Sequence, residues 1–179
     1  MSVDVEVIPT VAELYSWAEL RRRLLEYPLS DDCRRLVGRQ PALIEIPANR
    51  IVSDEDRIAP THRYYFDLNE TNTLGLIVER NAETGTEEQE FLDNFARNLS
   101  QERRAELAER WKAIGFSFVI GSNAGRSRSE PELLVALCVT VGELYRGQIL
   151  IQNSKLFSLP VGCYAPSEFR SVKPKFFLR

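Results

Sequence analysis

The fold is decided by the stretch "FSFVIGSNAGRSRSEPELLVALCVTVGELYRGQILIQ", residues 116–152. It begins with a short run typical of a buried strand, passes through a segment of turn formers and continues as an apolar helix from about 131 to 145. After a break at Arg146 and Gly147, a second strand is expected at 148–152. This order predicts a βαβ unit, a connection that joins parallel strands. The helix is apolar on most sides, which places it in the middle of the protein.

Around this unit the pattern predicts strands and helices in one continuous α+β domain, residues 1–179, with a mixed sheet packed by about four helices. A strand is expected at "ALIEIP", and an antiparallel hairpin at about 62–80, where two β-rich runs flank the turn formers "NETN". Helices are expected at 10–27, 31–38, from Thr86, and at 101–114.

Capping residues set the predicted helix ends. Thr10 and Glu13 stand at capping-box spacing before the first helix, and Ser30 and Ser100 precede two others. Gly38 and Gly115 follow or end helical runs, where glycine accepts the left-handed conformation.

Composition excludes several classes of protein. The 179 residues are 44% hydrophobic and 27% charged, with a formal net charge of -3, so the chain is globular and lacks the basic field of a nucleic-acid binder. No apolar run approaches the ~20 residues of a spanning helix, so we expect no membrane partner. The three cysteines are far apart, which argues against a disulfide framework or a zinc site and favours a cytoplasmic location. We expect no metal and no cofactor.

The loop "GSNAGRS" invites comparison with a phosphate-binding loop, because it follows a strand and precedes a helix. It departs from that motif because Gly121 and Gly125 are one residue too close and Arg126 stands in the lysine position. A simpler anion site at the helix start would use the loop residues Gly121, Ser122, Asn123, Gly125, Arg126 and Arg128. The favoured alternative is a plain strand-to-helix joint, in which Ser129 and Glu132 form a capping box.

The single histidine, His62, limits acid and base chemistry. A hydrolytic triad would have to use it, with Asp54, Asp56 or Asp67 as the orienting carboxylate. No nucleophile motif accompanies it, so we interpret His62 as a residue at a strand edge and predict no catalytic residues.

The C-terminal segment, 165–179, ends in the apolar residues Phe176, Phe177 and Leu178. Exposing three large apolar side chains together would create an adhesive patch. We therefore expect them to dock onto the domain or to contact a partner chain.

In outline, a small acidic α+β chain without a catalytic set resembles the bacterial immunity proteins, which neutralise a toxin by covering its site, although no motif carries over. The resemblance implies a non-enzymatic, immunity-like or regulatory protein-binding module. Its partner would be another protein, or a second copy in a homodimer, bound through an apolar surface. The alternative is a small domain or enzyme that binds an anionic or phosphate ligand at the 121–129 loop.

Overall fold

The computed structural model describes residues 3–38, 43–46, 48–60, 62–69, 72–80, 92–94, 96–122, 129–152 and 157–172. Within these residues the chain forms one eight-stranded sheet with the strand order β3-β2-β4-β5-β6-β1-β7-β8. The strands are β1 (Val3–Ile8), β2 (Ile44–Ile46), β3 (Arg50–Ile51), β4 (Arg63–Asn69), β5 (Asn72–Arg80), β6 (Phe116–Ser122), β7 (Gln148–Ile151) and β8 (Gly162–Tyr164).

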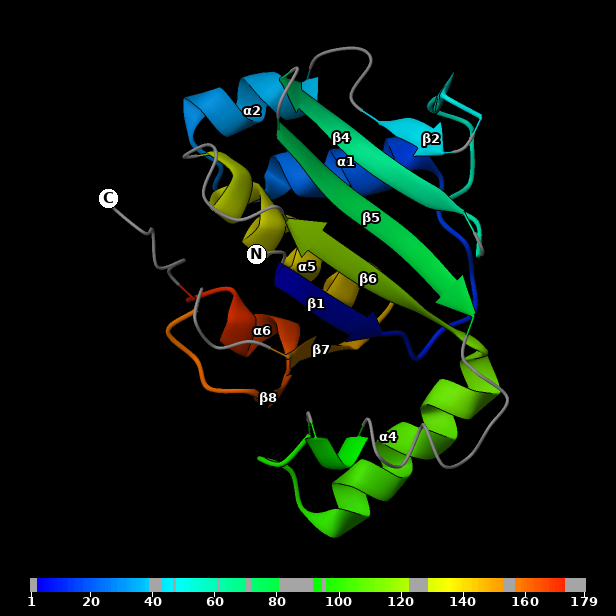
Figure 1. Ribbon diagram of the computed structural model, residues 1–179, viewed down its shortest axis with the longest axis vertical. Coiled ribbons are helices and arrows are strands. Elements are labelled where there is room, and N and C mark those ends of the chain that lie inside the picture. The colour runs from blue at the N-terminus through cyan, green and yellow to red at the C-terminus, as the bar shows by residue number, and fades with distance from the viewer. Residues whose placement is uncertain are drawn as a thin grey trace.

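The helices lie on both faces of this sheet. They are α1 (Trp17–Glu26), α2 (Asp31–Gly38), α4 (Gln101–Ile114), α5 (Ser129–Leu144) and α6 (Pro166–Phe169). α1, α2 and α5 lie behind the sheet in the view of Figure 1, a side we call the inner face, and α6 packs against α5 there. α4 packs on the opposite, outer face, over β1 and β7. The predicted α+β class is therefore confirmed.

The βαβ unit is present, but its two strands are not neighbours. β1 lies between β6 and β7 and is antiparallel to both, so β6 and β7 run parallel to each other one strand apart. Every pair of neighbouring strands in the described part of the sheet is consequently antiparallel, in contrast to the mixed sheet expected from the sequence. The reason is that the acidic, alternating N-terminal run inserts into the gap that the α5 crossover leaves.

α5 is the centre of the main core, as its composition predicts. Its residues from Leu133 to Val141 are nearly all buried, between the inner face of the sheet and the helices α1, α2 and α6. Gly142 and Gly147 make this packing possible. A Cβ atom at Gly142 would lie 2.8 Å from Pro166 in α6, and one at Gly147 would lie 2.4 Å from the Ile8 carbonyl oxygen.

The first helix begins later than predicted. Thr10 does not cap it; its hydroxyl donates to the Arg146 carbonyl, and the helix starts at Trp17 with Ser16 as N-cap. The N–H of Trp17 donates a hydrogen bond to the Asp56 carbonyl, and the N–H of Ala18 donates one to the Asp54 carbonyl. A turn far along the chain therefore satisfies the helix start, which no local pattern could reveal.

Other predicted ends are confirmed. Ser30 Oγ accepts from Cys33 N at 3.4 Å at the start of α2, and Ser100 Oγ accepts from Arg103 N at 3.3 Å at the start of α4. Gly115 ends α4 with φ of 78°. The hairpin is also present as β4 and β5, paired from Arg63 and Ile77 to Asn69 and Asn72.

Candidate functional site

The predicted anion loop is only partly described. Gly121 and Ser122 form the last residues of β6, where Gly121 pairs with Gly75 of β5 and Asp4 of β1. Asn123, Gly125, Arg126 and Arg128 lie outside the described residues, as do Phe176, Phe177 and Leu178. The anion site and the docking of the C-terminal segment therefore stay predictions.

The side chain of Ser129, which was expected to form a capping box with Glu132, lies outside the described residues, so that box stays a prediction. The carboxylate of Glu132 crosses to the start of α2, where it accepts hydrogen bonds from Ser30 N at 2.5 Å, Ser30 Oγ at 2.7 Å and Cys33 Sγ at 3.2 Å. A carboxylate is favourable at a helix N-terminus because the free N–H groups there carry partial positive charge. Glu132 thus joins the central helix to α2.

The outer face of the sheet carries one continuous row of side chains across seven strands. Each residue in the row is paired with the next in the register of the sheet: Ile46, Arg63, Ile77, Val119, Glu6, Leu150 and Cys163. At the β8 end the row is covered by α4, and Leu150 and Cys163 are buried. At the β2 end Ile46 is 42% exposed, and Ile77 is only half-buried.

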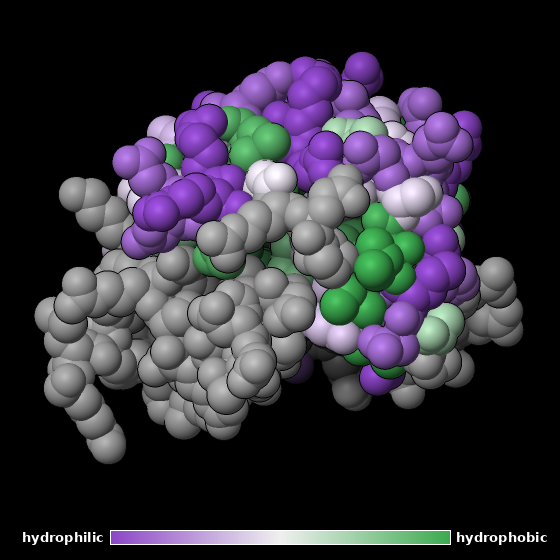
Figure 2. All heavy atoms as spheres, turned by 90° about the horizontal axis from the view of Figure 1, so that it is seen from above, coloured by the Kyte–Doolittle hydropathy of each residue, from purple (hydrophilic) through white to green (hydrophobic). Residues whose placement is uncertain are grey.

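A hollow lies on the open half of this face. It has a volume of about 360 Å³, and the residues that line it come from three strands: Ile46, Arg63, Tyr64, Tyr65, Gly75 and Ile77. Gly75 lies directly across from Tyr65, so the absent side chain leaves the space next to the tyrosine. Figure 2 views the end of the molecule that carries β2 and shows hydrophobic residues gathered there among hydrophilic ones.

His62 precedes β4, at the strand edge where the sequence places it, and a carboxylate that the sequence did not single out lies beside it. Its Nδ1 lies 2.8 Å from Oε1 of Glu45, the buried carboxylate of β2. Among the described side chains neither Asp54 nor Asp56 contacts it, and the side chain of Asp67 lies outside the described residues. Arg50 binds the second oxygen of Glu45, with Nη2 at 2.5 Å and Nε at 2.9 Å. Glu45 stands opposite both Arg50 and Tyr64 in the sheet, so the strand register brings the carboxylate and the guanidinium together.

The network continues from Arg50 into the 48–60 segment. Arg50 also binds Asp56 at 2.5 Å, and Asp56 accepts a hydrogen bond from Ser53 N at 2.7 Å. The Ser53 N–H, together with Arg50, holds the pKa of Asp56 below its ordinary value. A histidine oriented by a carboxylate is the first part of a general base. Here both carboxylate oxygens are occupied, and the arrangement ties the 48–60 segment to the sheet.

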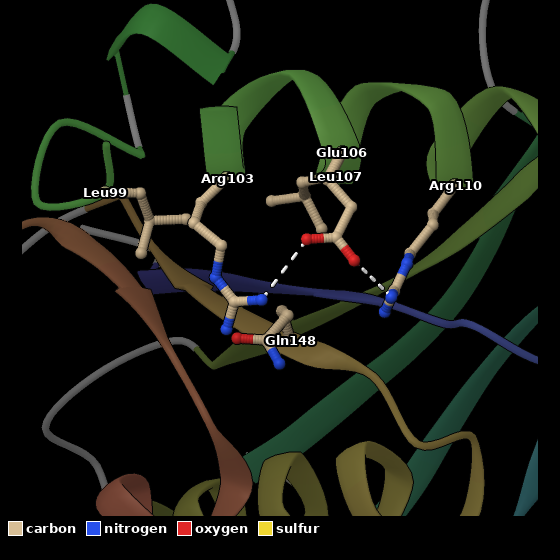
Figure 3. Close-up of a pocket in the computed structure, with 6 residues that line it drawn as sticks. All are labelled: Leu99, Arg103, Glu106, Leu107, Arg110 and Gln148. Atoms are coloured by element: carbon tan, nitrogen blue, oxygen red, sulfur yellow. Dashed lines mark hydrogen bonds and ion pairs between the residues drawn. The ribbon is translucent and has the colours of Figure 1, made fainter. Parts of the chain in front are cut away.

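A second pocket lies between α4 and β7. Figure 3 shows Arg103 and Arg110 extending from α4 on either side of Glu106, with Gln148 of β7 below. Glu106 binds Arg103 at 3.2 Å and also binds Arg110. All three side chains are at least 41% exposed, and such ion pairs contribute little to stability. The pocket holds about 70 Å³, well below the ~300 Å³ at which small-molecule sites begin.

The three cysteines are buried and none forms a disulfide. Desolvation raises the pKa of Cys138, and it raises the pKa of Cys163 to about 12. The thiolate is the reactive form of cysteine, so these thiols are poorly suited to nucleophilic chemistry at neutral pH.

Comparison of the chain with models of protein families, with curated proteins and with solved structures finds no match. Among the described residues, no helix is both long and apolar enough to cross a membrane. The same part of the chain contains no group of three His, Cys, Asp or Glu side chains placed to hold a metal ion.

Sequence reasoning did not single out the hollow, although its residues lie in strands that were predicted. A signal existed. In "TLGLIVE" the apolar residues do not alternate with polar ones, so both faces of β5 are apolar. That pattern indicates either a strand covered on both sides or a strand with a face left for a partner.

Proposed function

We propose that this protein is a non-enzymatic protein-binding module, immunity-like or regulatory, that contacts its partner through the open half of the outer sheet face. The proposal is carried by one observation: Ile46, Tyr65 and Ile77 border an open hollow of about 360 Å³ on that face. Their neighbours on the inner face, Phe66 and Leu76, are buried, so the same strands bury one side and leave the other accessible.

The chemistry of this face is that of a protein interface. Tyrosine and arginine are enriched where proteins bind one another, because each combines a large contact area with hydrogen bonding. Tyr65 supplies the aromatic ring, and Arg63 lies beside it on the same face. Single exposed apolar residues are ordinary, but a contiguous group is typical of an interaction site.

The non-catalytic character is supported by the sequence, in which no nucleophile motif accompanies the single histidine. The carboxylate that orients His62 is shared with Arg50, which is in turn bound to Asp56. Glu45 therefore fixes the 48–60 segment as well as orienting His62.

The test is site-specific photo-crosslinking in the source cell. A photo-reactive phenylalanine derivative at position 65 is expected to give one covalent adduct of defined mass, and the adduct should disappear when Ile46→Glu is added. The matched control places the same derivative at position 35, since the Arg35 side chain is 69% exposed on α2, away from the hollow. An adduct of twice the chain mass identifies the partner as a second copy. The same pattern of adducts from both positions, or none from position 65, contradicts the proposal.

A further inference from the structure

The hollow on the open half of the outer face has one charged side chain in its lining, that of Arg63, among apolar residues, aromatic residues and glycine. Arg63 is exposed, and no group in the described part of the chain binds its guanidinium. Most of the described arginines do bind a carboxylate, as Arg21 binds Asp54 and Arg170 binds Glu143. The guanidinium of Arg63 is therefore left available beside an apolar surface.

The described carboxylates at this end of the sheet are bound elsewhere. Glu45 precedes Ile46 in β2, so its side chain points to the opposite face of the sheet. There it binds Arg50 and His62, and Asp56 binds the same arginine. Among the described residues, the positive charge at the hollow thus has no counterpart within the chain, and a carboxylate from outside would supply one.

The aromatic wall of the hollow is held in place. The Tyr65 hydroxyl donates to Oδ1 of Asn49 at 3.3 Å, in the turn that joins β2 to β3. Gly75 lies opposite Tyr65 and leaves space beside the ring. Arg63 stands two positions before Tyr65 on β4, which separates the two Cα atoms by about 7 Å. The face therefore offers an apolar space and a cation at a set spacing before any partner binds.

We propose that the partner of this face is a protein with an acidic binding surface, an inference that rests on the function proposed above. The partner places an aliphatic or aromatic side chain in the hollow and a carboxylate, about 7 Å away, on Arg63. A guanidinium can bind a carboxylate through two parallel hydrogen bonds, which apolar surroundings strengthen. Because the whole chain carries a net charge of -3, the attraction is local to this face.

A second copy of this chain fits the hollow less well. A two-fold interface through this face would bring the same lining from both sides. That lining contains an arginine and no carboxylate, so two cations would be buried without a counter-charge. The partner is therefore expected to be a different protein.

The first experiment detects the carboxylate through a reaction that joins amines to carboxylates in direct contact. Arg63→Lys provides the amine, and a water-soluble carbodiimide is added to an extract of the source cell that contains the tagged variant. The expected product is an amide adduct through position 63, located by mass spectrometry, with the same partner mass as the position-65 photo-adduct. Arg57→Lys is the matched control and should give no such adduct. Arg57 is also exposed and without a described side-chain partner, and its backbone bridges Ser16 at the start of α1, on the inner face.

The second experiment reverses the charge. Arg63→Glu should lower the yield of the position-65 photo-adduct about tenfold or more, because it removes a charged hydrogen bond and sets two like charges together. Arg57→Glu should leave the yield unchanged, and thermal unfolding of each variant checks that the fold is kept. If Arg63→Glu does not fold, Arg63→Lys still decides, because it keeps the positive charge.

The outcomes separate this inference from the function on which it rests. A photo-adduct that forms undiminished in Arg63→Glu overturns the acidic partner and leaves the binding module in place. So does a photo-adduct without a carbodiimide adduct in Arg63→Lys. A photo-adduct that nuclease shortens, or one of twice the chain mass, also overturns the inference, because phosphate or a second copy then occupies the hollow. No photo-adduct at all contradicts the proposed function itself.

Discussion

The two halves of the outer sheet face are built from the same kind of antiparallel strands, but one half is covered by a helix and the other is exposed. Over β1, β7 and β8 the face is covered by α4, with Trp111 and Leu107 against Ile8 and Leu150. Over β2, β4 and β5 it is open, and Ile46 is 42% exposed. A single cross-strand row joins the two halves, so strand register alone does not decide what is buried. The difference lies in the residues that α4 contacts, which belong to β1, β7 and β8.

The stability of the covered half should depend strongly on its contacts with α4. Trp111→Ala removes the largest side chain that α4 places on the sheet, and we expect it to lower the free energy of unfolding by about 3–5 kcal/mol. Urea denaturation followed by circular dichroism measures this change. Lys112→Ala, one position along and with a side chain 54% exposed, is the control and should change it by less than about 0.5 kcal/mol. Equal effects would mean that α4 is not part of the cooperative core.

Substitutions at two adjacent residues of β5 should show the difference between the inner and the outer face of the sheet. Leu76 is fully buried on the inner face and Ile77 is half-buried on the outer one. Leu76→Ala should cost about 2–5 kcal/mol, whereas Ile77→Ala should cost less than about 1 kcal/mol while abolishing the position-65 adduct. A large loss of stability from Ile77→Ala would show that the open half is structural rather than available to a partner.

The burial of Cys163 under α4 should also make the free energy of unfolding depend on pH. The pKa of Cys163 is raised to about 12 from an ordinary 9.0, because its thiol is buried and the thiolate is not solvated there. The unfolded chain therefore loses this proton first, and the free energy of unfolding should fall as pH rises from 9 towards 12, by about 1.4 kcal/mol per pH unit at most. Cys163→Ala should flatten that part of the profile, measured by denaturation at several pH values. Identical profiles for the two proteins would contradict the burial.

The smallest effect is expected at Gly75. A Cβ atom there would lie 3.7 Å from the Gly121 carbonyl oxygen, an ordinary contact, so Gly75→Ala should fit without strain. It should stabilise the protein by about 0.4–1 kcal/mol, because alanine restricts the unfolded chain more than glycine does. Thermal unfolding measures the gain. A clear loss instead would show that the space beside Tyr65 is needed for folding.

Local patterns predicted local structure well. The apolar periodicity of 131–145 gave α5, and the turn formers between two β-rich runs gave the β4–β5 hairpin. Ser100 and Gly115 marked the ends of α4, because capping depends on residues within one turn of the helix. Each of these features is stabilised by contacts within a short stretch of chain.

Non-local features escaped prediction for the corresponding reason. The insertion of β1 between β6 and β7, the Glu132 cap on α2 and the His62–Glu45 pair all join residues far apart in sequence. Nothing in the sequence around Asn98 indicates that its side-chain amide bonds Cys163 of β8. The hollow left only the apolar run of β5 as a signal, because its lining comes from three strands that the fold brings together.

The position of β1 has a consequence for how the chain folds during synthesis. β1 precedes the other described strands, yet its two partners, β6 and β7, are made about a hundred residues or more after it. Until then an apolar strand has no neighbour, while the β4–β5 hairpin can close at once. Distant pairings of this kind slow folding and leave nascent strands open to wrong partners. We therefore expect β1 to stay unpaired in the nascent chain until β6 and β7 have been made.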